Sequence, residues 1–196
     1  MAKIVILASG SGSNAEALIR FSQSSDAYSV TAVISDQPEA FVLQRAKNLK
    51  IPSYLVAQEK AETKFQYNLK LLETVKSLNP DWIVLAGYMK LLSAEFLKTF
   101  FDSRLGQNRI INIHPSLLPL FPGKESYEKA YNSAESEFGC TIHFVDEGMD
   151  TGKIIYQTRL QKIADESFQD FKDRGLALEN KTYPVILEKL IKEYRS

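Results

Sequence analysis

KIVILASGSGSNAEALI, residues 3–19, is the stretch that decides the fold. The continuous apolar run that opens it is typical of a β-strand buried on both faces. After the glycines, Ala15, Leu18 and Ile19 recur at the spacing of one helix face. We expect Asn14 to cap that helix, because a short polar side chain satisfies free backbone amides there. A buried strand, a glycine turn and a helix in this order predict the first unit of a parallel sheet.

The same alternation of strand and helix continues to the end of the chain. Further strands are predicted at 30–35, 53–56, 81–87, 109–113, 139–145 and 153–160, and helices at 40–50, from 63, from 93, at 127–132 and from 167. Pro184 in the last segment predicts either a kink or the first turn of a second helix. The pattern predicts a single domain over residues 1–196 with an α/β, Rossmann-like fold: a mainly parallel twisted sheet with helices on both faces.

Composition excludes several classes of protein. The 24 basic residues balance the 24 acidic ones, so no overall charge points to a nucleic-acid or membrane partner. Cys140 is the one cysteine, which rules out an intrachain disulfide and a cysteine-rich zinc site. The first apolar run is too short for a membrane span and lacks the features of a secretory signal. We therefore expect a cytoplasmic enzyme.

Glycines and small polar residues at 10–15 (GSGSNA) join the first strand to the first helix. Glycines allow a sharp turn, and the free amides at a helix start suit a phosphate. A tight turn with a good cap would give the same pattern. The spacing also fits the dinucleotide pattern G-x-G-x-x-A, with Asp36 placed to hold a ribose. The motif indicates a phosphate without naming the molecule that carries it.

INIHPSLLP, residues 111–119, places Asn112 and His114 two residues apart at a strand end. Such residues point to the same side of a strand. An amide donor beside a titratable imidazole suits acyl transfer, in which one polarises a carbonyl and the other handles charge or protons. The alternative is a buried histidine whose ring is satisfied by the backbone.

DEGMDTG, residues 146–152, follows a predicted strand that contains His143. Acidic residues among glycines often form only a solvated turn. Here the loop should emerge at the carboxyl edge of the sheet, where ligands bind in such folds. A metal site built from the two histidines and these carboxylates lacks any typical ligand spacing, so no metal is expected.

Taken in order, GSGSN (10–14), GYMKLLS (87–93), INIHPSLLPLFPGK (111–124) and FVDEGMDTG (144–152) resemble the phosphoribosylglycinamide formyltransferase family. The resemblance runs over nearly the whole chain, and INIHPSLLP is its most specific part. It implies the formyltransferase fold and transfer of a formyl group from 10-formyltetrahydrofolate, a co-substrate, to the primary amine of glycinamide ribonucleotide. The products would be formylglycinamide ribonucleotide and tetrahydrofolate, in de novo purine synthesis.

The resemblance also implies roles for individual residues. The catalytic residues would be Asn112, His114 and Asp150, with His143 in a supporting role. The acceptor would contact Gly12, Ser13, Asn14 and Glu179. The folate would contact Lys64, Met89, Lys90, Leu91, Leu92, Asn112, Val145, Asp146 and Glu147. Residues 1–100 would form a phosphate-binding half and residues 101–196 a folate and catalytic half.

Two departures from the family pattern bear on the pocket. Lysine stands at position 90, where arginine is usual, and at position 64, where arginine is frequent, so the two-pronged fork that binds carboxylates is lost. Glu125-Ser126-Tyr127 replaces the usual histidine-bearing segment after FPGK. That substitution leaves one side of the pocket without an assigned role.

We expect the substrate amine to attack the formyl carbon directly, without an enzyme nucleophile. Asn112 and a protonated His114 would stabilise the oxyanion of the tetrahedral intermediate. Asp150, itself or through a water, would take the proton of the amine and return it to the leaving nitrogen. Because a nearby carboxylate favours the charged imidazole, we expect Asp150 to raise the pKa of His114.

Several alternatives share parts of this pattern. A sugar-nucleotide formyltransferase would use the same catalytic residues on another amine. Methionyl-tRNA formyltransferase carries a further C-terminal domain and formyltetrahydrofolate hydrolase a further N-terminal domain, so the length of this chain disfavours both. An NAD-linked oxidoreductase would explain the glycine loop but not Asn112, His114 and Asp150. Small-molecule substrates are expected, in a monomer or homodimer.

Overall fold

The computed structural model describes residues 1–194, which form a seven-stranded sheet covered by helices, with a separate two-stranded hairpin. The elements in chain order are β1 (Ala2–Leu7), α1 (Ser13–Ser22), β2 (Tyr28–Ser35), α2 (Phe41–Asn48), β3 (Ser53–Leu55), α3 (Lys64–Ser77), β4 (Trp82–Leu85), α4 (Ala94–Thr99), β5 (Phe101–Asp102), β6 (Gln107–Asn108), β7 (Ile110–His114), α5 (Ser126–Asn132), β8 (Glu137–Phe144), β9 (Ile154–Gln161) and α6 (Phe168–Glu193).

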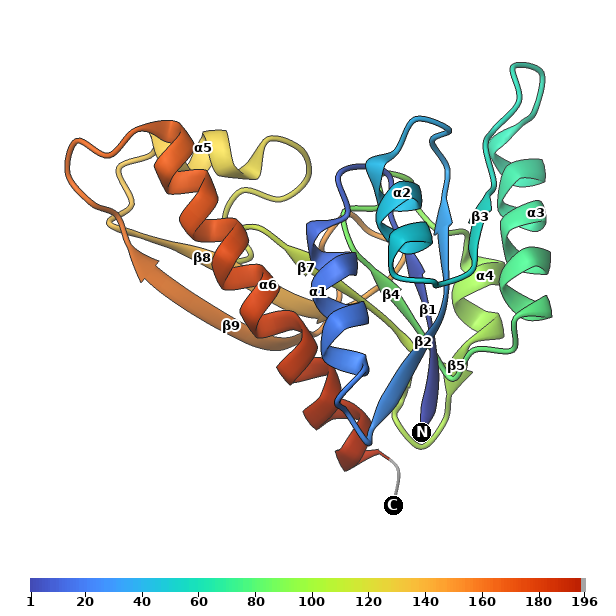
Figure 1. Ribbon diagram of the computed structural model, residues 1–196. Helices are drawn as coiled ribbons and strands as arrows, with labels where there is room; N and C mark the ends of the chain where they lie inside the picture. The colour runs from blue at the N-terminus through green and yellow to red at the C-terminus, as the bar shows by residue number, and fades with distance from the viewer. Residues whose placement is uncertain (195–196) are drawn as a thin grey trace.

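The large sheet has the strand order β3-β2-β1-β4-β7-β8-β9. The first five strands in this order are parallel. β8 then pairs antiparallel with β7, and β9 pairs antiparallel with β8. Helices α1, α2 and α6 cover one face, while α3 and α4 cover the other (Figure 1). The predicted α/β class, with a mainly parallel sheet between helices, is confirmed.

β1 shows why the opening stretch fixes this arrangement. Ile4 and Ile6 belong to the core beneath α1, α2 and α6. Val5 and Leu7 belong to the core beneath α3 and α4. Successive residues of a strand point to opposite faces of the sheet. All four side chains are fully buried because helices cover both faces. Burying each of them contributes roughly 1.5–3 kcal/mol, so helices on both faces stabilise this strand.

Gly12, not Asn14, caps helix α1. Its backbone is left-handed, with φ of 76°, and no side chain caps the helix. A Cβ at Gly12 would lie 2.5 Å from Val42 Cγ2, so the turn needs glycine for space as well as for conformation. Asn14 lies inside the first turn, and the expected capping role is wrong because its side chain points instead to Glu179 of α6.

Helix α6 runs without a break through Pro184, so the alternative of a second helix is wrong. Ser167 caps its start, where its hydroxyl accepts a hydrogen bond from the amide of Asp170. Tyr183 lies fully buried between the helix and the sheet. Its hydroxyl is 3.0 Å from the carbonyl oxygen of Leu85 in β4 and 3.2 Å from that of Ile111 in β7. This contact ties α6 to the two strands whose ends form the site described next.

Candidate active site

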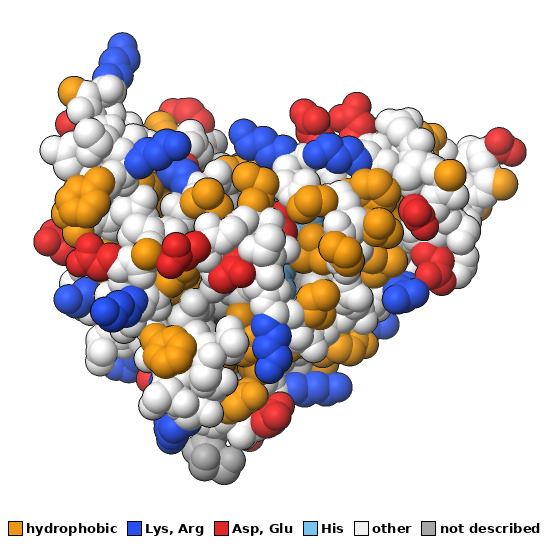
Figure 2. Space-filling model, turned by 180° about the vertical axis from the view of Figure 1, so that it is seen from behind, with side chains coloured by type: hydrophobic (Ala, Val, Ile, Leu, Met, Phe, Trp, Pro, Cys, Tyr) orange, Lys and Arg blue, Asp and Glu red, His pale blue; other side chains and the backbone are white. Residues whose placement is uncertain are grey.

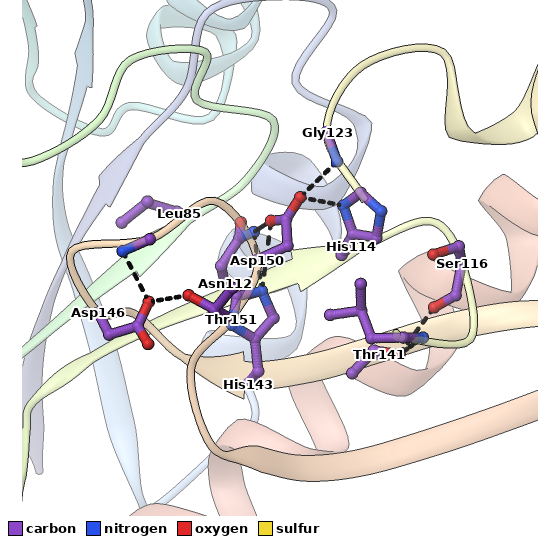
Figure 3. A network of polar contacts seen from close by, with 12 residues as sticks. Leu85, Asn112, His114, Ser116, Gly123, Thr141, His143, Asp146, Asp150 and Thr151 are labelled. Carbon is purple, nitrogen blue, oxygen red and sulfur yellow. Dashed lines mark hydrogen bonds and ion pairs between the residues drawn. The ribbon is translucent and has the colours of Figure 1, made fainter. Parts of the chain in front are cut away.

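β7 and β8 bring three polar side chains to one point of the sheet. Asn112 and His114 alternate with apolar residues on β7, and the antiparallel register sets His143 of β8 directly opposite Asn112. The loop between β8 and β9 then returns over the sheet and carries Asp150 to the same point (Figure 3). Residues far apart in sequence therefore meet because β8 reverses direction beside β7.

Asp150 is the centre of this group (Figure 3). Its Oδ2 lies 3.2 Å from Nδ1 of His114 and accepts a hydrogen bond of 2.8 Å from the amide of Gly123. Its Oδ1 lies 3.5 Å from Nδ2 of Asn112 and 3.6 Å from Nε2 of His143. Asp150 has a left-handed backbone, with φ of 57°, a conformation that aspartate tolerates better than most residues. The structure thus brings Asn112, His114 and Asp150 together, as the sequence predicts.

The pKa values of His114 and Asp150 are both lowered, but for different physical reasons. Burial lowers the pKa of His114, and the nearby Phe121 carbonyl and Asp150 carboxylate only partly offset that effect. The expectation of a raised pKa is therefore wrong, because loss of water around a ring that is 4% exposed outweighs the carboxylate. For Asp150, burial would raise the pKa, but the His143 ring, the Gly123 amide and the charge of His114 together hold it below its usual value.

These residues lie at the bottom of a cavity of about 800 Å³. Figure 2 shows histidine atoms within a hollow that is surrounded by hydrophobic side chains, with lysine or arginine side chains along its upper rim. The sequence-predicted residues that line the cavity are Gly12, Ser13, Asn14, Met89, Lys90, Leu91, Leu92, Asn112, His114, Val145, Asp146, Asp150 and Glu179, together with His143. One continuous space therefore joins the glycine loop to the group of residues around Asp150.

Two predicted folate contacts are not among the residues that line this cavity. Lys64 is the first residue of α3, directly after Thr63, whose side chain and Gln66 form a reciprocal capping box. Glu147 is exposed in the loop between β8 and β9. Asp146 does line the cavity, but its Oδ1 accepts hydrogen bonds from the Gly148 amide at 3.1 Å and the Thr151 hydroxyl at 2.7 Å. Asp146 therefore shapes the loop that carries Asp150.

The far end of the cavity holds a second carboxylate, Glu179, which is only 4% exposed. One of its oxygens accepts a 2.6 Å hydrogen bond from Asn14 Nδ2, and the other accepts one from the Tyr127 hydroxyl. Among residues 1–194 no lysine, arginine or histidine forms an ion pair with it. Burial raises its pKa, and the two hydrogen bonds oppose that rise only in part.

The segment from Met89 to Leu92 forms an apolar wall of the same cavity. Met89 and Leu91 are more than half exposed, while Leu92 is buried. Lys90 is held in place, because its Nζ lies 4.2 Å from the centre of the Tyr67 ring and donates a 2.7 Å hydrogen bond to Gln58 Oε1. A fixed cation beside exposed apolar side chains suits a ligand with a flat apolar body and an anionic tail.

Sequence reasoning missed the part of the cavity formed by α5 and the first turns of α6. Ser126, Tyr127, Phe168 and Lys172 line it, and none of them was assigned a role. Gly175, in the middle of a helix, was the available signal, because such a glycine usually has a packing reason. A Cβ at Gly175 would lie 2.3 Å from Cε1 of Tyr127, so the glycine makes room for that ring.

Comparison with known proteins agrees with this geometry. Residues 2–187 match the family model described as formyl transferase. The chain belongs to the formyl transferase family. Phosphoribosylglycinamide formyltransferase of Bacillus subtilis is 35% identical over 192 residues, which cover 97% of this chain and 95% of that protein.

Other relatives place the same unit in different settings. The chain is 37% identical over 192 residues to the trifunctional purine biosynthetic protein adenosine-3 of Drosophila melanogaster, of which it spans 14% of the length. Glycinamide ribonucleotide transformylase 1 from Symbiobacterium toebii has the same fold, with a TM-score of 0.91 and 32% identity, over 98% of this chain and 89% of that one. The protein is therefore a transferase of the formyl transferase family with the predicted fold.

Two general features of the described residues complete the picture. None of the helices within residues 1–194 is long and apolar enough to cross a bilayer. Within the same residues no group of three or more His, Cys, Asp and Glu side chains is arranged to hold a metal ion.

Asp36, the ribose ligand in the dinucleotide interpretation, is buried beside Gln37 and is not among the residues that line the cavity. Family membership sets that interpretation aside.

Proposed function

We propose that this formyl transferase moves the formyl group of 10-formyltetrahydrofolate to the primary amine of glycinamide ribonucleotide, in de novo purine synthesis. The observation that carries the proposal is the meeting of Asn112, His114 and Asp150 in a cavity that extends to the glycine loop at Gly12. One end can hold a phosphate and the other can process a carbonyl. The names of the relatives with the same fold and near-complete coverage support formyl transfer to this acceptor.

In this proposal the two substrates enter the cavity from different sides. The phosphate of the acceptor lies against the free amides of Gly12, Ser13 and Asn14, where the start of α1 favours an anion. Glu179 and Asn14 contact the body of the acceptor. The apolar wall from Met89 to Leu92 holds the folate, with its formyl group beside Asn112.

The reaction then needs only proton transfer and charge stabilisation. The amine attacks the formyl carbon, which gives a tetrahedral intermediate with a negative oxygen and a positive nitrogen. Asn112 Nδ2 donates a hydrogen bond to that oxygen. His114 Nδ1, beside Asp150, donates a second one when the ring is protonated, because Nε2 faces the carbonyl of Phe121. Asp150, directly or through a water, takes the proton from the nitrogen and passes it to the folate nitrogen as the carbon–nitrogen bond breaks.

The lowered pKa of His114 fits a role that changes during the reaction. In the free protein, burial favours the neutral imidazole. A negative oxygen that forms nearby favours the charged ring, so the ring takes up a proton from solvent as the intermediate forms and releases it when the intermediate breaks down. Donors of this kind contribute about 10²–10³ in rate, and general acid–base help about 10²–10⁴.

The remaining assignments belong to the same proposal. We place the protein in the cytoplasm, as a monomer or homodimer that acts on small molecules without a nucleic-acid or membrane partner. The roles of Lys64 and Glu147 in folate binding, and the division of the chain into two functional halves at residue 100, stay predictions.

The test is an assay for tetrahydrofolate release from 10-formyltetrahydrofolate, with and without glycinamide ribonucleotide. We expect release only when the nucleotide is present, together with formylated nucleotide detected by mass spectrometry. Release without any acceptor would identify a hydrolase instead. Release only with an amino-sugar nucleotide would move the proposal to the other class of acceptor.

A further inference from the structure

The segment at residues 125–127, which departs from the family pattern, places a tyrosine against the buried carboxylate Glu179. Tyr127 lies in the first turn of α5, and its hydroxyl donates a hydrogen bond to Oε1 of Glu179. The ring packs edge-on against Phe171, with 6.4 Å between ring centres, and fits the space left by Gly175. Both contacts fix the hydroxyl at the end of the cavity where the acceptor is proposed to bind.

Glu179 depends on neutral donors to remain charged. It has two hydrogen-bond donors, Tyr127 and Asn14, and no cation pairs with it among the described residues. A buried carboxylate with neutral partners is sensitive to each of them, because every lost donor favours the protonated form. Oδ1 of Asn14 is itself buried and without a hydrogen-bond partner, so it is free to accept one from a ligand in the cavity.

We propose that Tyr127 is a positioning residue for the acceptor, which acts by keeping Glu179 ionised and oriented beside Asn14. This inference rests on the proposed function only in the choice of acceptor. Tyr127 takes no part in bond formation, so its loss should affect binding of the acceptor more than the rate at saturation. A hydrogen bond to a charged group contributes enough to change affinity by about tenfold or more.

The neighbours of Glu179 make its titration readable. Tyr127 of α5 and Cys140 of β8 are the titratable groups that face it, and α1 contributes the amide of Asn14. Burial raises the pKa of both Tyr127 and Cys140 well above neutrality, so neither changes charge in the range in which a carboxylate titrates. Removing the Tyr127 hydroxyl takes away a donor that favours the ionised form. The pKa of Glu179 should then rise further.

Tyr127→Phe tests the inference, and Tyr131→Phe is the matched control. Tyr131 lies one turn later on α5, packs on Phe168 and Phe171, and donates a 2.8 Å hydrogen bond to the carbonyl of Glu166. It is not among the residues that line the cavity. We expect Y127F to raise KM for glycinamide ribonucleotide about tenfold or more, with a smaller change in kcat and none in KM for the folate. Y131F should match the wild type.

The pH dependence separates this role from a merely structural one. As the pH is lowered, kcat/KM for the acceptor should start to fall at a higher pH in Y127F than in the wild type. The reason is that Glu179 of the variant takes up its proton at a higher pH. Titration of the substrate itself cancels in this comparison. An acid limb at the same pH in both proteins would overturn the inference, whatever the loss of activity.

A measurement without substrate covers the case in which the variant is unstable or the acceptor is another amine. The infrared band of the protonated Glu179 carboxyl, assigned by its loss in Glu179→Gln, should appear at a higher pH in Y127F than in wild type and Y131F. An unchanged titration would overturn the role of Tyr127. Failure of the wild type to formylate glycinamide ribonucleotide would instead overturn only the proposed acceptor.

Discussion

Asp150 and Glu179 are two carboxylates in one cavity, and their surroundings shift their pKa values in opposite directions. Asp150 has two histidines and a backbone amide around it, and its pKa is lowered. Glu179 has an amide and a phenol, is more deeply buried, and its pKa is raised. Burial raises both pKa values, but it is deeper at Glu179, and only Asp150 has ionisable neighbours that outweigh it. Ionisable partners keep the first charged over a wide pH range, while neutral donors leave the second responsive to pH.

The two carboxylates also differ in how the chain supplies them. Asp150 sits in a loop with a left-handed backbone, and it is held by the amide of Gly123 from a second loop. Glu179 lies on a 26-residue helix that the sheet supports along its length. A group on a loop can adjust during a proton transfer, whereas a group on a rigid helix is better suited to fix a ligand.

Exchanging each carboxylate for its amide should give the largest contrast. Asp150→Asn removes the proposed base, so we expect kcat to fall by about 10²–10⁴ with little change in KM for the acceptor. Glu179→Gln should instead raise KM for the acceptor, with a smaller effect on kcat. Steady-state kinetics of the two variants measures the contrast. Near wild-type turnover in D150N would remove Asp150 from the mechanism.

Asn112→Ala sharpens the contrast at the catalytic end. The side chain supplies a donor to the developing oxyanion, and its loss should lower kcat by about 10²–10³. Single-turnover rates with both substrates bound would measure this loss. Because Asn112 Nδ2 also lies 3.3 Å from Nε2 of His143, a His143→Ala variant is the comparison for indirect effects. A larger loss in H143A than in N112A would reverse the two roles.

Gly12→Ala should disturb the acceptor end through the backbone. An alanine there would adopt a positive φ, which costs about 1–3 kcal/mol, and its Cβ would also contact Val42. Gly87→Ala is the matched variant, because Gly87 has a φ of +73° with nothing within 4 Å of the added Cβ. Urea unfolding should show a greater loss of stability in G12A than in G87A. The difference between the two losses measures the effect of the contact with Val42. Equal losses would mean that Val42 moves aside.

The smallest effect concerns stability and acid. The pKa of His114 is lowered in the folded protein, so below its usual value of 6.5 the unfolded chain binds a proton more readily than the folded one. The stability associated with the neutral ring is present above that pH and is lost as the pH falls. The unfolding free energy of His114→Asn should therefore decline less than that of the wild type from about pH 7.5 to about pH 5.5. Parallel declines would mean that folding leaves the pKa of His114 unchanged.

Much of the fold followed from the sequence because its signals are local. A strand buried on both faces, a glycine turn and a helix stripe in residues 3–19 suffice to place the first unit of the sheet. The helices predicted from residues 63 and 93 also begin there, where Thr63 and Ser93 cap α3 and α4. The short hairpin of β5 and β6 was not predicted, since two-residue strands carry no periodic pattern.

The parts that failed depend on contacts between distant residues. Asparagine is a common residue at the start of a helix, but the side chain of Asn14 binds Glu179, which lies 165 residues away. His114 was expected to have a raised pKa because its carboxylate neighbour could be inferred and the extent of its burial could not. Tyr127 was noticed only as a departure from a pattern. Its contact with Glu179 required the packing of α5 on α6.

The hydroxyl of Tyr183 has a consequence for the choice of acceptor. It links helix α6, four residues after Glu179, to the carbonyl of Ile111, the residue before Asn112. The distance between Glu179, where the acceptor is anchored, and Asn112, where it reacts, is thus set inside the hydrophobic interior. Neither solvent nor a bound molecule can adjust it there. Amines would then be selected by reach: a molecule one or two bonds shorter or longer between its anionic group and its nitrogen would bind yet leave the nitrogen out of line with the formyl carbon.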